Sequence, residues 1–197
     1  MLTAADLLAP LIAAVSGLSG VLIGGLIASH NQKQERRQRF IRDQLTEFYA
    51  PLLGIREQLR AYGKIRLKVN DAAGAVWPRL MEKAQERGIE HLRETEEKLW
   101  PGYQKIIEDH NEQLKQELVP LYRQTVAIFT AKMQFAETST RQYFGVLVEF
   151  VELWERYVRN ALPGHVAARV VPSEESLSDF YADLQTNFER LQATLKE

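Results

Sequence analysis

Residues 41–69 read IRDQLTEFYAPLLGIREQLRAYGKIRLKV, and their apolar positions decide the fold. Apolar side chains recur there every three or four residues, which is the spacing of one face of an α-helix. Pro51 removes one backbone hydrogen bond and predicts a kink, but the stripe keeps its register beyond it. A long helix in this place predicts an all-α protein. The stripe consists of Ile41, Leu45, Phe48, Leu52, Ile55, Leu59, Tyr62, Ile65 and Val69.

The chain beyond this stretch continues the helical pattern. Asp71–Trp77, which contains Gly74, predicts the turn that ends the first helix, and a second helical stretch is expected from Pro78 onward. Trp100–Gly102 predicts a break or bend in that stretch, and Pro120 marks its next corner or kink. No segment alternates apolar and polar residues with β-branched side chains, so we expect no strands.

Residues 121–162 are predicted to form a third helical stretch, the most apolar of these stretches. Glu152 and Arg156 lie four residues apart on its polar face, where such pairs stabilise a helix. After a loop at 163–172, Ser173 or Ser176 is expected to cap a last helix that continues to the C-terminus. Stretches of about 40 residues predict an elongated antiparallel helical bundle roughly 50–60 Å long.

Upstream of the first helix, residues 7–29 read LLAPLIAAVSGLSGVLIGGLIAS and carry no charge. At about 1.5 Å per residue they span roughly 34 Å, enough to cross a hydrocarbon core of ~30 Å. We therefore expect residues 1–29 to be a single transmembrane anchor. A cleaved signal peptide would need basic residues before a shorter apolar core, and a buried core helix would carry more polar interruptions; both are alternatives.

Basic residues follow the predicted anchor and none precedes it. This bias predicts a single-pass protein of the inner (plasma) membrane, with its N-terminus outside and residues 43–197 forming a cytoplasmic helical bundle. The juxtamembrane segment 30–42 is expected to contact lipid headgroups, each basic side chain contributing about 1 kcal/mol near an anionic surface. The alternative is that these residues only set the topology. They are Lys33, Arg36, Arg37, Arg39 and Arg42.

Small residues recur at every fourth position of the predicted anchor: Ser16, Gly20, Gly24 and Ala28. This spacing places them along one face of a helix, where a second backbone can approach closely. We expect this face to mediate self-association in the bilayer. The alternative is that glycine is simply common in membrane helices.

Composition limits the partners. After residue 29 the chain holds 25 basic residues and 25 acidic ones, because Asp6 alone of the 26 acids precedes that point. A domain without net charge is a poor match for nucleic acid, whose nonspecific binding depends on neutralised phosphates. The chain has no cysteine, which excludes disulfides and thiolate chemistry.

The sequence offers no catalytic, cofactor or metal signature, and we expect a protein that is not an enzyme. There is no nucleophile elbow, no His-Glu-x-x-His motif and no Glu-x-x-His pair of the kind that builds di-iron sites in bundles. A metalloprotein or enzyme that uses His91, Glu94 and His110 is an alternative. For His110, which lies on an apolar stripe, a core position is the simpler interpretation.

These features predict a membrane-anchored, self-associating helical scaffold whose bundle presents a surface to an unidentified cytoplasmic protein partner. The alternative is an oligomeric membrane effector whose glycine-rich anchors form a pore. Phe48–Leu52, after a basic run, resembles a segment of bacterial single-span proteins whose function is unknown. That resemblance covers too little of the chain to imply a fold or an activity.

Overall fold

The structure is a computed structural model that describes residues 32–196, and this part of the chain is all-α, without strands. The helical bundle expected from the sequence is confirmed. None of the helices within these bounds combines the length and the apolarity that crossing a bilayer requires. The predicted anchor and its small-residue face (Ser16, Gly20, Gly24 and Ala28) lie outside the described residues.

The first helix runs without a break through Pro51. A leading helix at residues 32–44 passes into a π-helical turn, Leu45–Tyr49, and then into α2, Ala50–Glu86. In the π-helical turn the Ala50 N–H bonds to the Leu45 carbonyl, five residues back. Pro51 is the second residue of α2, which follows this π-helical turn directly. The helix therefore resumes at once, as its stripe predicted.

The predicted turn at Asp71–Trp77 is wrong, because α2 continues through it to Glu86. The turn lies at Gly88, whose φ of 110° favours glycine, and the second helix, α3, spans Ile89–Gln113 rather than starting at Pro78. The Trp77 ring packs between the two helices, with its centroid 5.8 Å from that of Trp100 and 4.5 Å from that of Tyr103. These ring contacts help to hold α2 and α3 together as a hairpin beyond the predicted turn.

The second stretch also continues as helix through both of the proline sites at which a break was predicted. Pro101 lies inside α3, so the helix is not broken at Trp100–Gly102. Pro120 marks no corner either: a second π-helical turn, Leu114–Leu118, leads directly into α4, Val119–Lys132. As before Pro51, this π-helical turn ends two residues before the proline. At both positions a π-helical turn closely precedes a proline, and the helix continues beyond it.

The third stretch is not one helix, which corrects the expectation for residues 121–162. The chain turns between α4 and α6, Phe144–Val158, through the short helices Met133–Phe135 and α5, Thr138–Arg141. Ala136 and Glu137 are extended there. As a result α4 and α6 pack on each other near the base of the hairpin, instead of forming a third long rod.

The C-terminal part contains a helix that the sequence did not predict: α7, Gly164–Val170, within the expected loop. A short 3-10 turn, Glu174–Leu177, precedes the last helix, α8, Ser178–Lys196. The predicted last helix is thus confirmed, but it begins beyond Ser173 and Ser176. Ser176 instead donates its hydroxyl to the Ser173 carbonyl at 2.8 Å.

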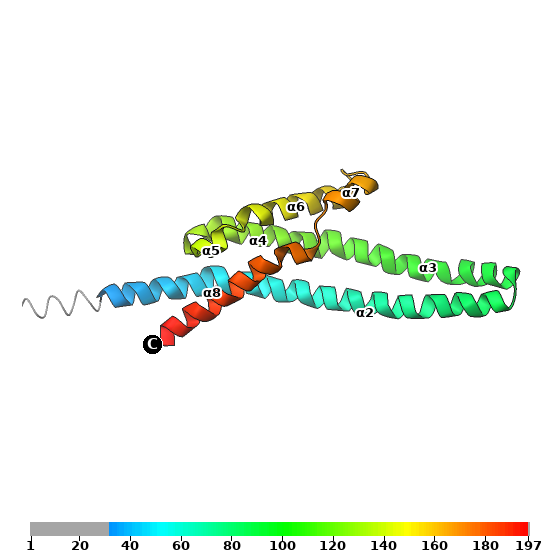
Figure 1. Ribbon diagram of the computed structural model, residues 1–197, viewed down its shortest axis with the longest axis horizontal. Coiled ribbons are helices and arrows are strands. Elements are labelled where there is room, and N and C mark those ends of the chain that lie inside the picture. Colours follow the sequence, from blue (N-terminus) through cyan, green and yellow to red (C-terminus); the bar gives the residue numbers. More distant parts are fainter. Residues whose placement is uncertain (1–31, 197) are drawn as a thin grey trace, which may run out of the picture.

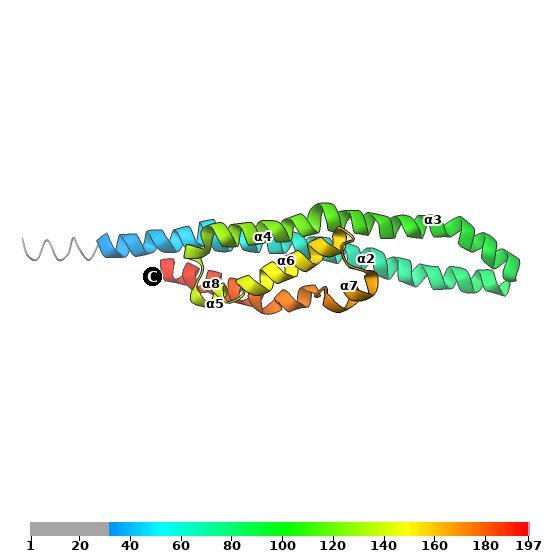
Figure 2. The same ribbon diagram turned by 90° about the horizontal axis from the view of Figure 1, so that it is seen from above.

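The described residues divide into a body and an arm. Figure 1 shows α2 and α3 extending side by side away from the other helices, and Figure 2 shows the same arrangement from above. We call residues 64–113 the arm and the remainder the body. The start of the leading helix and the C-terminus lie at the end opposite the arm tip. α3 buries no residue, so the core belongs to the body; its fully buried large side chains include Phe48, Tyr49, Leu52, Leu59, Phe129, Leu147, Phe150, Leu177, Phe180 and Leu184.

Candidate functional site

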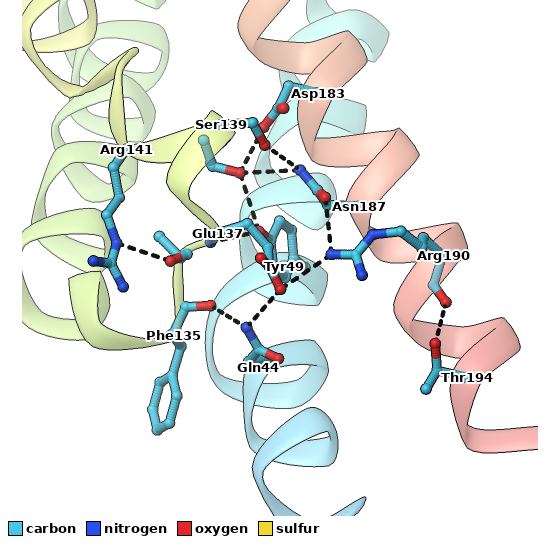
Figure 3. Close-up of polar contacts among 12 residues, drawn as sticks. Gln44, Tyr49, Phe135, Glu137, Ser139, Arg141, Asp183, Asn187, Arg190 and Thr194 are labelled. Carbon is cyan, nitrogen blue, oxygen red and sulfur yellow. Dashed lines mark hydrogen bonds and ion pairs between the residues drawn. The ribbon is translucent and has the colours of Figure 1, made fainter. Parts of the chain in front are cut away.

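A buried polar junction joins the leading helix to α8 through the α4–α6 connection (Figure 3). At its centre the hydroxyls of Tyr49 and Thr140 lie 3.0 Å apart, and both side chains are fully buried. Tyr49 is placed by the π-helical turn, whereas Thr140 is placed by α5. Burial raises the pKa of the Tyr49 hydroxyl, although its hydrogen bonds to Thr140 and to the Glu137 backbone oppose that shift.

The direction of the hydrogen bonds follows from the groups at their ends. The Glu137 backbone N–H, which only donates, lies 3.0 Å from the Tyr49 hydroxyl oxygen. At the other end Thr140 donates to an Asp183 carboxylate oxygen at 2.5 Å. The Tyr49 hydroxyl must therefore donate to Thr140, which also accepts from the Asn187 amide at 3.3 Å. The result is a one-way chain from a backbone amide to a carboxylate.

A second set of contacts surrounds this chain. The Gln44 amide donates to the Phe135 carbonyl at 2.9 Å and to the Glu137 carboxylate at 3.3 Å. Arg190 from α8 forms an ion pair with Glu137 at 3.0 Å and a hydrogen bond to the Asn187 side-chain oxygen at 3.2 Å. The Glu137 carboxylate thus binds side chains of both the leading helix and α8.

The groups of the junction have a structural role, because they hold helices together. Its buried side chains bond to one another, and it contains no histidine, lysine or cysteine that would act as a nucleophile or base. The groups of the α4–α6 connection hold the leading helix and α8 in one relative position. This junction was not predicted from the sequence, in which the run of hydroxyl residues Thr138–Thr140 is the one feature that points to it.

The five basic residues predicted to contact lipid are all exposed on the leading helix. At 100° per residue they cover an arc of about 220° around the helix. The remaining sector of about 140° holds Ile41 and Leu45, which are buried in the body. Arg36 bonds to Gln32 of its own helix, and no ion pair involves any of the five within the described part of the chain. Their contact with lipid stays a prediction; they are Lys33, Arg36, Arg37, Arg39 and Arg42.

The residues of the metalloprotein alternative do not come together. His91 lies 3.9 Å from Glu94 within one exposed turn of α3. His110 is nineteen residues beyond His91 on α3, about 28 Å away at 1.5 Å per residue. Between residues 32 and 196 no three potential metal ligands form a group.

A cleft lies where the arm meets the body. Its outer part, about 430 Å³, is lined by Arg66 and His110 from the arm and by Trp154 from α6. A deeper cavity of about 210 Å³ adjoins it and reaches Tyr122 and Glu174. Burial raises the pKa of Tyr122, as do the nearby Tyr181 and Glu174. Arg66, Glu174 and several aromatic rings line the cleft, which would suit a small aromatic molecule.

The chain was compared with protein-family models, with curated proteins and with solved structures. None of the three comparisons found a match.

Proposed function

We propose that the chain is a membrane-anchored, self-associating helical interaction protein that presents its arm to a partner at a distance from the bilayer. The observation that carries the proposal is the division into body and arm. The arm extends from the end of the body opposite the leading helix (Figure 1). Large apolar side chains are exposed along both of its helices. A core packs its apolar residues inside, so an exposed set of them favours a binding role.

The distribution of charge on the leading helix supports a helix that stands upright on the membrane. A helix that lies in the membrane surface carries its basic residues along one side, opposite an apolar face. The basic residues of the leading helix cover an arc of about 220° instead, and the remaining apolar side, with Ile41 and Leu45, is buried in the body and does not face a membrane. This arrangement suits a helix that leaves the headgroups upright. We place the single transmembrane anchor at residues 1–29 and the bundle on the cytoplasmic side of the inner (plasma) membrane.

Self-association is assigned to the small-residue face of the anchor, Ser16, Gly20, Gly24 and Ala28. Close backbone approach along such a face is what packs helices in lipid, where no hydrophobic force drives them together. Leucine at Gly20 and Gly24 would separate the two backbones. The matched control is Ala14→Leu, which adds the same side chain about 200° around the helix from Ser16.

The experiment is chemical cross-linking of the full chain in detergent micelles at micromolar concentration, with the two leucine variants beside it. We expect cross-linked oligomers for the parent chain and for Ala14→Leu, and a loss of most of them for Gly20→Leu combined with Gly24→Leu. A parent chain that stays monomeric would contradict self-association. Oligomers that persist in the double variant would exclude this face as their cause.

A further inference from the structure

The arm carries opposite net charges on its two helices. Residues 64–87 hold six basic and three acidic side chains, whereas α3 holds three basic and seven acidic ones. The charges of the two helices are therefore complementary, but no ion pair joins them within the arm of the described chain. A second arm turned by 180° would place its acidic α3 against the basic part of α2, and its basic part of α2 against the acidic α3.

One face of the arm also carries an unpartnered apolar seam. Ile65, Val69, Ala72 and Val76 follow one another at intervals of four, three and four residues, which places them on a single side of α2. Ile65, Ala72 and Val76 are exposed, and Val69 is half-buried. The same seam borders a surface hollow of about 280 Å³, whose other wall is formed by Gly102, Ile106 and Asp109 of α3. α2 and α3 thus form one grooved face.

We infer that this face docks onto the same face of a second copy of the chain. The inference rests on the proposed function in one respect: two copies anchored in one membrane stand parallel, so their arms meet along a two-fold axis parallel to the arms. Around that axis α2 of each copy lies against α3 of the other and runs antiparallel to it. Four such helices make a left-handed bundle of ordinary geometry.

The Trp77 ring packs on Trp100 and Tyr103. This contact fixes which residues of α2 and α3 stand at the same height along the arm. By this register Val76 stands level with Gly102, and Ala72 stands level with Ile106. A two-fold axis parallel to the arm preserves these levels between copies. Val76 therefore meets Gly102 of the other copy and Ile106 meets Ala72, and the space above Gly102 is open. Alternation of large and small residues lets facing helices interdigitate.

Charges flank the seam at both ends in the same register. Lys68 stands level with Asp109, and Lys83 stands level with Glu94. All four side chains are exposed. In the dimer each lysine faces a carboxylate of the other copy across the two-fold axis. The flanking charges thus act as the e and g positions of a coiled coil do, where they set the partner and its orientation.

The available area suits a specific interface. The arm is about 35 Å long, since each of its helices has about 23 residues at 1.5 Å, and two helices side by side are about 20 Å wide. The product is roughly 700 Å² on each copy, close to the ~800 Å² that each partner buries in a standard interface.

The test uses the full chain in phosphatidylcholine vesicles with energy transfer between copies, and it carries Gly20→Leu with Gly24→Leu so that association through the anchor does not hold the arms together. The chain has no cysteine, so Gln85→Cys near the arm tip provides a single labelling position for donor or acceptor. Ile65→Asp places a charge in the seam and should weaken association through the arms at least about tenfold. Leu67→Asp is its matched control, because Leu67 is equally exposed but lies about 200° around α2 from Ile65.

Charge reversal tests the pairing directly. Lys68→Glu with Lys83→Glu makes the α2 side of the arm acidic, and Glu94→Lys with Asp109→Lys makes the α3 side basic. Each variant alone should lose transfer, because its homodimer opposes like charges. A mixture of the two, one labelled with donor and the other with acceptor, should recover it. The circular dichroism spectrum of each variant must stay helical, which separates loss of docking from loss of folding.

The outcomes separate this inference from the proposed function. Transfer that is equal in Ile65→Asp and Leu67→Asp would overturn docking through the seam, as would a mixture of charge variants that fails to recover. Neither result would contradict the proposed membrane anchor. A chain that does not enter vesicles would contradict the proposed function, and the same energy-transfer series in solution would then test the arm.

Discussion

Thr140→Val removes one oxygen atom from the centre of the polar junction and leaves the shape of the side chain almost unchanged. The lost hydroxyl donates to Asp183 and accepts from Tyr49 and Asn187. Asp183 is only half-buried and can bond to water instead. The Tyr49 hydroxyl is fully buried and would be left with a proton but no acceptor.

The size of the effect follows from these environments. A hydrogen bond to a charged group contributes about 1.5–3 kcal/mol, and a stranded buried donor costs about 1–3 kcal/mol. Because Asp183 regains water, we expect Thr140→Val to lower the free energy of unfolding by about 2–4 kcal/mol. Tyr49→Phe strands only the Glu137 N–H and should cost about 1–3 kcal/mol.

The double variant distinguishes a connected chain from independent contacts. With Tyr49→Phe and Thr140→Val together, no hydroxyl proton is stranded between the two positions. The double variant should therefore lose about 1–2 kcal/mol less than the sum of the single variants.

The assay is denaturant unfolding followed by circular dichroism at the helical band. Thr130→Val is the control, because the Thr130 hydroxyl bonds only to the Val126 carbonyl of its own helix and is exposed. We expect that control to change stability by less than about 0.5 kcal/mol. Strict additivity of the two junction variants, or a Thr140→Val effect no larger than that of Thr130→Val, would refute the chain of hydrogen bonds.

Three further predictions concern the turn and the tyrosines. Gly88→Ala should lower the melting temperature, because a φ of 110° costs an L side chain about 1–2 kcal/mol, whereas Gly102→Ala, which meets open space, should not. Tyr181→Phe should leave stability unchanged or slightly higher in denaturant unfolding, because its buried hydroxyl has no partner among the described residues. The folded pKa values of Tyr49, Tyr122 and Tyr181 are raised by burial. The folded state therefore favours the protonated tyrosines, so the free energy of unfolding should be full below pH 10 and should decline as the pH rises above 10. Tyrosinate absorbance would follow the ionisation. Tyrosines that all ionise together at pH 10 in the folded chain would contradict this prediction.

Apolar spacing predicted the helices of the body well. The apolar residues of the stripe from Ile41 to Leu59 are buried. An apolar face of a helix is stable in water only when it packs against other apolar side chains, so such a stripe predicts a core position. The last helix was predicted for the same reason. Such stripes do not depend on which partner covers them, so sequence alone identifies them.

The turns were harder, because rules for proline and glycine describe a tendency that context can override. Pro78 and Pro101 lie inside α2 and α3. Each proline leaves the carbonyl four residues earlier without its usual donor, at Gly74 and Glu97, and both of these residues are exposed to water. In an exposed arm that cost is small enough for the helix to continue.

The turn between α4 and α6 could not be predicted from glycine or proline. Residues 121–144 contain neither glycine nor proline, and the pattern predicted one helix. The chain turns there because side chains far away in sequence satisfy its backbone: Gln44 bonds to the Phe135 carbonyl, and Tyr49 bonds to the Glu137 N–H. The polar junction could not be predicted for the same reason, since its contacts exist only after the leading helix, the corner and α8 have assembled.

The most direct test of the account is whether the full chain is held by the bilayer. Membranes from cells that express it would be extracted with alkaline carbonate, which releases peripheral proteins, and then with detergent. We predict that the chain stays in the membrane pellet through carbonate and is released only by detergent. Recovery of the full chain in the aqueous fraction without detergent would contradict the anchor, and with it the upright bundle and its outward arm.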